Sequence, residues 1–141
     1  MFHRLSSHNE LRIHECLLRQ VHEHAFQDLT NLRYLNLDHN KLTPLPAHLF
    51  QNQKELQMLN LNNNLITYLP DDLFTPLVNL KLVLLNKNNF KTLPQNLFLN
   101  NKYLNDFNLK HNAISSLEGV INYLLQNFLA EIIDLICLST L

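Results

Sequence analysis

The chain has 141 residues, 46% of them hydrophobic, and a formal net charge of −1 at pH 7. This length fits one domain or one short array of repeats, and the apolar content is ample for a core. Acidic and basic residues are interspersed and glycine occurs once, so neither a nucleic-acid-binding stripe nor a glycine-rich nucleotide loop is indicated.

The dominant pattern is a repeat of 24 residues, in which a phenylalanine, a leucine and an asparagine each recur at constant spacing. A fixed period of this length predicts a solenoid, whose stacked units contact only their neighbours and share one continuous core. Solenoids mostly bind other molecules along one face. The recurring residues are Phe2, Phe26, Phe50, Phe74 and Phe98; Leu32, Leu56, Leu80 and Leu104; and Asn40, Asn64, Asn88 and Asn112.

The front of the chain lacks the signs of a secreted protein. Its first ten residues contain no apolar signal region, and Phe2 is already in phase with the repeat. Cys16 and Cys137 have no spacing typical of a disulfide or a metal site, and no N-x-S/T glycosylation motif occurs. We therefore expect the chain to begin inside a repeat.

Four units align well, starting at residues 32, 56, 80 and 104, after a weaker unit over residues 8–31. Their shared pattern is L-x-x-L-x-L-x-x-N-x-L-x-x-L-P-x-x-L-F-x-x-L-x-x, and it resembles the leucine-rich repeat family in its 24-residue "typical" subclass. The resemblance covers about residues 2–117. It implies an α/β solenoid shaped as a curved horseshoe, with a parallel sheet on the concave face and an irregular, extended convex side. We divide the chain into residues 1–117, about five repeats with the first one partial, and a C-terminal segment over 118–141.

Within each unit, the x-L-x-L-x segment alternates with period two and predicts a short strand with leucine pointing inward. The asparagine after it stands where the chain must turn, and its amide can bond backbone groups of its own and adjacent units. Removing such a buried partner costs about 1–3 kcal/mol. The family pattern accepts cysteine here, so we interpret Cys16 as structural and not as a reactive thiol. The predicted ladder is Cys16, Asn40, Asn64, Asn88 and Asn112.

The return path of three units contains a Leu-Pro pair, at Leu45-Pro46, Leu69-Pro70 and Leu93-Pro94. Proline fixes φ and removes a hydrogen-bond donor, which favours an extended or turn-like convex side over a regular helix. The Leu-Phe pairs that follow are expected to pack between coils.

The last segment has a different period. Ser115-x-x-Glu118 is typical of a capping box, and apolar residues then recur at three- and four-residue steps, which predicts an amphipathic helix over the last coil. A transmembrane span is an alternative, although Glu131 and Asp134 make insertion costly. A decayed sixth repeat or a tail foreign to the fold are the others. Extracellular members of the family usually carry cysteine-rich caps; without them, we expect a fragment of a longer protein or a partly disordered first unit.

The outward strand residues are expected to form columns about 5 Å apart across neighbouring units. Their centre is apolar, at Tyr34, Met58, Leu82 and Leu84, and their edge is polar, as in protein interfaces. Outward positions of any sheet include some apolar residues, so the pattern alone leaves both readings open. The predicted partner-binding residues are Tyr34, Met58, Leu82, Leu84, Arg12, Asn36, Asn60, Asp38, Asp106 and Lys110.

Catalytic and metal-binding patterns are not found. The chain has eight histidines, but His22-Glu23-His24 supplies only a local pair, and His39 and His111 lie three units apart. No nucleophile elbow, phosphate loop or paired carboxylates occur, so we expect neither an enzyme nor a cofactor.

The resemblance implies a non-catalytic module that binds a protein through its concave sheet. It implies an extracellular or cell-surface receptor, matrix or immune protein, similar to Toll-like receptors, small proteoglycans and arthropod cell-surface repeat proteins. The alternative is an intracellular scaffold or targeting subunit, for which absent glycosylation motifs and disulfides would be natural. We expect no nucleic acid or metal partner, and membrane association only through residues 118–141 or parts outside this chain.

Overall fold

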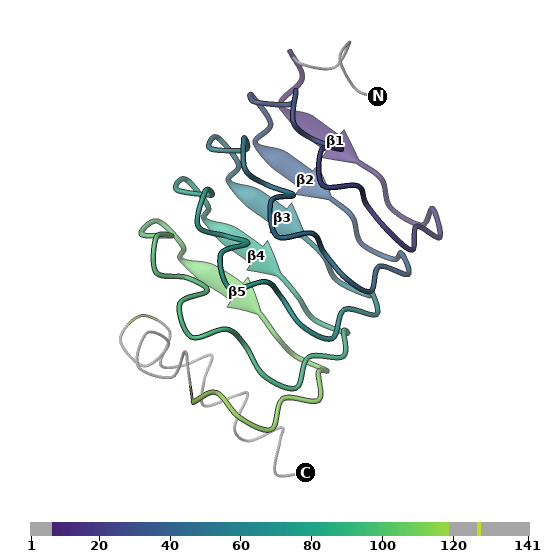
Figure 1. Ribbon diagram of the computed structural model, residues 1–141, viewed down its shortest axis with the longest axis vertical. Helices are drawn as coiled ribbons and strands as arrows, with labels where there is room; N and C mark the ends of the chain where they lie inside the picture. The colour runs from purple at the N-terminus through teal and green to yellow at the C-terminus, as the bar shows by residue number, and fades with distance from the viewer. Residues whose placement is uncertain (1–6, 119–126, 128–141) are drawn as a thin grey trace.

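Each 24-residue unit forms one coil that contains one strand of three residues (Figure 1). The computed structural model describes residues 7–118 and Asn127. We number the coils 1 to 5, from residues 8, 32, 56, 80 and 104 respectively. The strands are β1 (Glu10–Arg12), β2 (Tyr34–Asn36), β3 (Met58–Asn60), β4 (Leu82–Leu84) and β5 (Asp106–Asn108).

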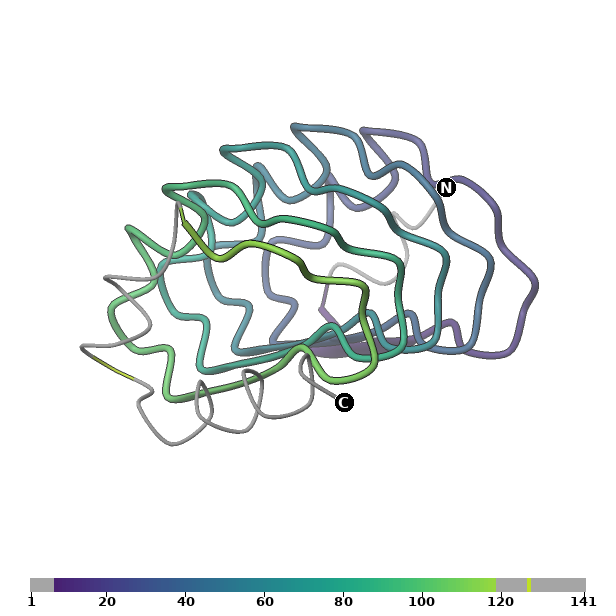
Figure 2. The same cartoon turned by 90° about the horizontal axis from the view of Figure 1, so that it is seen from below.

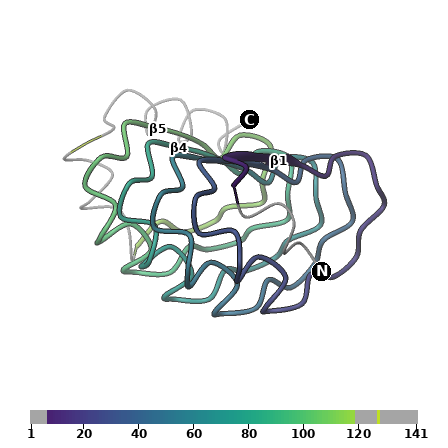
Figure 3. The same ribbon diagram turned by 90° about the horizontal axis from the view of Figure 1, so that it is seen from above.

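The strands pair in parallel, in the order β1-β2-β3-β4-β5, and every pair keeps a register of 24 residues. Tyr34 therefore pairs with Met58, and Met58 with Leu82. Figures 2 and 3 look along the stack from its two ends, with the strands on one side and the turns on the other. The solenoid with a parallel sheet, expected from the period, is confirmed.

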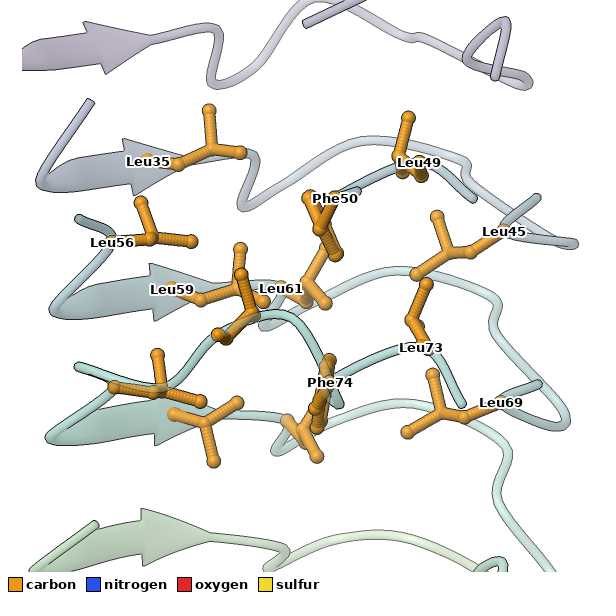
Figure 4. Close-up of a cluster of buried hydrophobic side chains, with 14 of the residues drawn as sticks. Leu35, Leu45, Leu49, Phe50, Leu56, Leu59, Leu61, Leu69, Leu73 and Phe74 are labelled. Atoms are coloured by element: carbon orange, nitrogen blue, oxygen red, sulfur yellow. The ribbon is translucent and has the colours of Figure 1, made fainter. Parts of the chain in front are cut away.

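The core fills the space between the strands and the return path of each coil. Figure 4 shows Leu35 and Leu59 pointing from β2 and β3 into this space, toward Phe50 and Phe74 from the opposite side. These side chains are at most 1% exposed. Burial of a side chain of this size contributes about 1.5–3 kcal/mol, so the repeated leucines and phenylalanines supply most of the stabilisation.

Turns, and no helix, form the convex side of residues 7–118. The N–H of Leu49 donates to Pro46 O at 3.1 Å, and the N–H of Leu73 donates to Pro70 O at the same distance. Proline starts these two turns because its fixed φ suits the turn and its missing N–H is not needed there, whereas coil 1 has His22 at the equivalent position.

The residue before each ladder position has a left-handed backbone, with φ between 51° and 57° at Glu15, His39, Asn63, Lys87 and His111. This conformation costs an L-residue about 1–2 kcal/mol, and asparagine tolerates it best. In coils 2 to 5 the turn is held in place because the ladder asparagine that follows bonds carbonyls of its own coil and of the preceding coil.

The predicted C-terminal helix over 118–141 lies outside the described residues, apart from Glu118 and Asn127. In the part of the chain that the structure describes, no helix has the length and apolar character needed to span a bilayer.

Candidate functional site

The side-chain amides of the ladder asparagines make their hydrogen bonds within the fold. Nδ2 of Asn40 donates to Leu37 O at 3.0 Å and to Ile13 O of the preceding coil at 2.7 Å, while its Oδ1 accepts from the N–H of Leu18 at 3.0 Å. Asn64, Asn88 and Asn112 repeat this arrangement, each reaching back to a carbonyl 27 residues earlier. Both ends of each amide are thus used, which leaves them no role toward a ligand.

Cys16 stands at the ladder position of coil 1, where its side chain is exposed. Its backbone N–H donates to Asn40 Oδ1 at 3.1 Å, and its Sγ donates to His14 O at 3.1 Å. A thiol has a weak donor and a weak acceptor on one sulfur atom, so it cannot repeat the bonding that the asparagines make with two separate polar atoms.

We call the outward side of β1 to β5, opposite the core, the sheet face. Tyr34 is 42% exposed there, and Met58, Leu82 and Leu84 are half-buried. The register places Tyr34, Met58 and Leu82 in one column and Leu84 in the next. These four residues, here named the apolar strip, lie on three adjacent strands.

A hollow of about 420 Å³ lies at one end of the sheet face. Tyr34 and Met58 from the apolar strip line it, together with the exposed pair Glu10 and Arg12, which form an ion pair. Because that pair is exposed, it adds little to stability and leaves charge available to a partner. The other lining residues are Leu11, Leu35 and Asn36.

The asparagines in the outward column that contains Leu84 have a structural role that the sequence pattern does not predict. Oδ1 of Asn36 accepts the N–H of Asp38 at 3.0 Å, Oδ1 of Asn60 accepts that of Asn62 at 3.0 Å, and Asn108 accepts that of Lys110 at 2.9 Å. Each asparagine therefore closes a local turn after its strand. Asn60 is only 9% exposed, so it offers a partner little surface.

Leu84 occupies the same column but has no acceptor for the N–H two residues on. That N–H, of Asn86, donates instead to Asn62 Oδ1 in the preceding coil, at 2.8 Å. The turn after the neighbouring strand thus supplies the acceptor that a leucine cannot provide.

Charged residues surround the apolar strip. Asp106 pairs with Leu82 in the register, and Lys110 extends beyond β5 in the same coil. On the other side, Asp38 Oδ2 lies 3.0 Å from His39 Nδ1. The ten predicted binding residues thus all belong to one sheet and its edge, but only Arg12, Tyr34, Asn36 and Met58 line the hollow.

Among residues 7–118 and Asn127, no group of three or more His, Cys, Asp or Glu side chains is placed to hold a metal ion. The sheet face can therefore offer apolar contact, hydrogen bonds and a few charges.

Solved structures support the fold. The leucine-rich repeat domain of APL1B matches with a TM-score of 0.76 at 23% identity, covering 77% of this chain and 33% of that chain. The LRIM1/APL1C complex matches equally at 0.76 and 23%, covering 77% and 20%. A Toll chain in the Drosophila Toll–Spatzle complex matches with a TM-score of 0.72 at 33% identity, covering 79% and 15%. This chain thus spans a third or less of each of these chains.

A search of curated proteins finds no significant match. The family profile described as "Leucine rich repeat" matches residues 1–42 and 31–89, which together exceed half of the chain. The 24-residue register, the buried leucines and the asparagine ladder agree with that match. The chain belongs to the leucine-rich repeat family.

Proposed function

We propose that this chain is a non-catalytic recognition module that binds a protein partner through the apolar strip of its sheet face. The structural relatives support a binding role, since two of them are described in complexes, LRIM1/APL1C and Toll–Spatzle. By the same resemblance, we propose an extracellular or cell-surface immune or receptor protein.

Leu84 is the observation that carries the proposal. Asparagine at this position closes the local turn in coils 2, 3 and 5, whereas leucine removes that bond and is only half-buried in return. A residue that breaks a local rule without a structural gain is expected where function selects it. The gain here would be apolar contact with a partner.

The surroundings of Leu84 fit an interface. Leu82 lies in the same strand, and Tyr34 and Met58 continue the apolar surface over β3 and β2. Protein interfaces place such anchors at an uncharged centre, with charged residues at the rim. Truncating a central anchor typically costs more than 1 kcal/mol of binding free energy.

The test is Leu84→Asn, which restores the turn-closing amide while removing the apolar contact. We expect an unchanged or higher melting temperature and at least about tenfold weaker partner binding. Proteins captured from the native source are compared by quantitative mass spectrometry between wild type and variants, and affinities are then measured. Leu99→Asn, at a 66% exposed position on the convex turn, is the matched control and should retain every partner.

A stronger perturbation is the double variant Leu82→Glu with Leu84→Glu, which should abolish capture and leave the circular dichroism spectrum intact. Partners that survive both this variant and Leu84→Asn would place the contact on a flank or the convex side, and the proposal would be wrong.

The alternative is an intracellular scaffold or targeting subunit with the same binding face. The N-terminal sequence and intact mass of the endogenous protein distinguish the two. A longer product with a cleaved signal and a cysteine-rich cap supports the extracellular assignment, whereas a product that starts at Met1 favours the alternative.

A further inference from the structure

Within residues 7–118, two polar side chains are fully buried between coils on the convex side, Gln53 and Asn101. Nε2 of Gln53 donates to Phe26 O at 2.6 Å and to Leu29 O at 3.3 Å. Both acceptors belong to the preceding coil, so the side chain joins coil 2 to coil 1.

Asn101 makes the same connection two coils later. Its Nδ2 donates to Phe74 O at 2.9 Å and to Leu77 O at 2.8 Å, which joins coil 4 to coil 3. The acceptors lie 27 and 24 residues earlier in both cases. Coils 1 and 3 have a buried leucine at the equivalent position, Leu29 and Leu77.

Aromatic stacking follows the same grouping. The rings of Phe26 and Phe50 are stacked, with centroids 6.3 Å apart and planes 5° from parallel, and Phe74 and Phe98 are stacked at 6.1 Å and 26°. Phe50 and Phe74, which belong to coils 2 and 3, form no stack of this kind. Phe98 makes a further, tilted contact at 5.9 Å with Phe107 of coil 5.

The segment of each coil that starts at the stacked phenylalanine and contains the buried amide or leucine is here called the corner. Its amino-acid sequence also alternates from coil to coil. It is FQDLTN in coil 1 and FTPLVN in coil 3, but FQNQKE in coil 2 and FLNNKY in coil 4. Coils 1 and 3 have leucine at the fourth position of this segment and asparagine at the sixth. Coils 2 and 4 instead have a buried amide at the fourth position and lysine at the fifth, so the pattern repeats every two coils.

We infer that the structural unit of this solenoid is a pair of coils, residues 8–55 and residues 56–103, each joined by one buried amide clamp. A leucine would fill the space equally well, and replacing buried polar groups by packed apolar ones is often neutral or stabilising. The amide instead specifies which coils stack, because only a coil that presents the two carbonyls in place satisfies its buried N–H groups. Nearly identical coils need such a device, since slipping by one unit would otherwise bury a similar core.

The junction between the two pairs lies between β2 and β3, and the apolar strip crosses it between Tyr34 and Met58. Leu77 takes the place of the clamp there, and the convex bond across the junction is from Asn79 Nδ2 to Lys54 O, at 2.9 Å and exposed. The sheet and the asparagine ladder cross this junction as they cross the others, for example from Asn64 Nδ2 to Leu37 O at 3.0 Å. The buried clamps therefore distinguish the pairs on the convex side alone, and local opening of that side should stay within one pair.

Native-state hydrogen exchange of the full chain tests this inference, using variants that keep the volume but remove the donors. Gln53→Met should speed exchange about tenfold at the corners of coils 1 and 2 and less than threefold in residues 56–103. Asn101→Leu should do the reverse. A cost of about 1.4 kcal/mol for two lost bonds gives the tenfold estimate.

Gln53→Ala and Asn101→Ala provide a larger perturbation with the same expected locality. Leu77→Ala is the control at the junction, and it should speed exchange in both pairs. Equal acceleration of both halves by Gln53→Met and by Gln53→Ala would overturn the inference, as would no change in any of the four clamp variants.

Discussion

Replacing the buried ladder residue Asn64 by alanine should cost about 4 kcal/mol of unfolding free energy. Asn64 is 4% exposed, and its Nδ2 donates to Leu37 O at 3.0 Å and to Leu61 O at 3.1 Å. Its Oδ1 accepts the N–H of Leu42 at 3.0 Å. Alanine leaves that buried N–H without a partner, at about 1–3 kcal/mol, and each carbonyl bond lost adds about 1 kcal/mol.

Urea unfolding followed by circular dichroism measures this change, with the m-value checked for constancy. The matched control is Asn112→Ala at the half-buried last rung, which makes analogous bonds to Leu85 O and Leu109 O and accepts from Phe90. Water can replace part of these, so about 1–2 kcal/mol is expected there. A loss below about 1 kcal/mol for Asn64→Ala would show that the ladder is not a main source of stability. A larger loss for Asn112→Ala than for Asn64→Ala would show that burial does not set the size of the effect.

Three other changes have defined outcomes. Lys87→Gly should raise stability by about 0.5–1 kcal/mol, because φ is 55° there and glycine adopts it without strain; an unchanged melting temperature would argue against strain at this turn. Asn62→Ala should destabilise the wild type by about 1–2 kcal/mol but should be nearly neutral in a Leu84→Asn background, because the restored amide closes the turn; a double-mutant cycle without coupling refutes this exchange of acceptors. Removing residues 120–141 should lower the melting temperature and solubility if that segment caps the last coil, and a truncated chain that melts later would contradict the capping role.

The 24-residue period was enough to predict the sheet, its register and the core, because each inward position repeats one residue type. Leu35 and Leu59, for example, are both at most 1% exposed in equivalent places. The period predicted less about the amides. Alternation predicts that Asn36 lies on the outward face, but it does not predict that its Oδ1 also accepts the N–H of Asp38, which is possible because an outward asparagine before a turn can fold back onto the backbone. Alternation along a strand gives the direction of a side chain and not its hydrogen-bond partner.

Two kinds of residue depart from the repeat pattern in this chain, and they differ in whether they lie in the core or on the outward face. Gln53 and Asn101 depart from the shared pattern at a buried position, recur every second coil and satisfy carbonyls of the coil before, so their reason lies within the fold. Leu84 departs at an outward position, where coil 1 also lacks the asparagine and has Arg12, and it gives up a bond that a neighbour must then supply. Packing within the chain accounts for the first kind of departure but not for the second. A partner that covers Leu84 would account for it, and for this reason Leu84→Asn should separate binding from stability more cleanly than a change at any other position of the apolar strip.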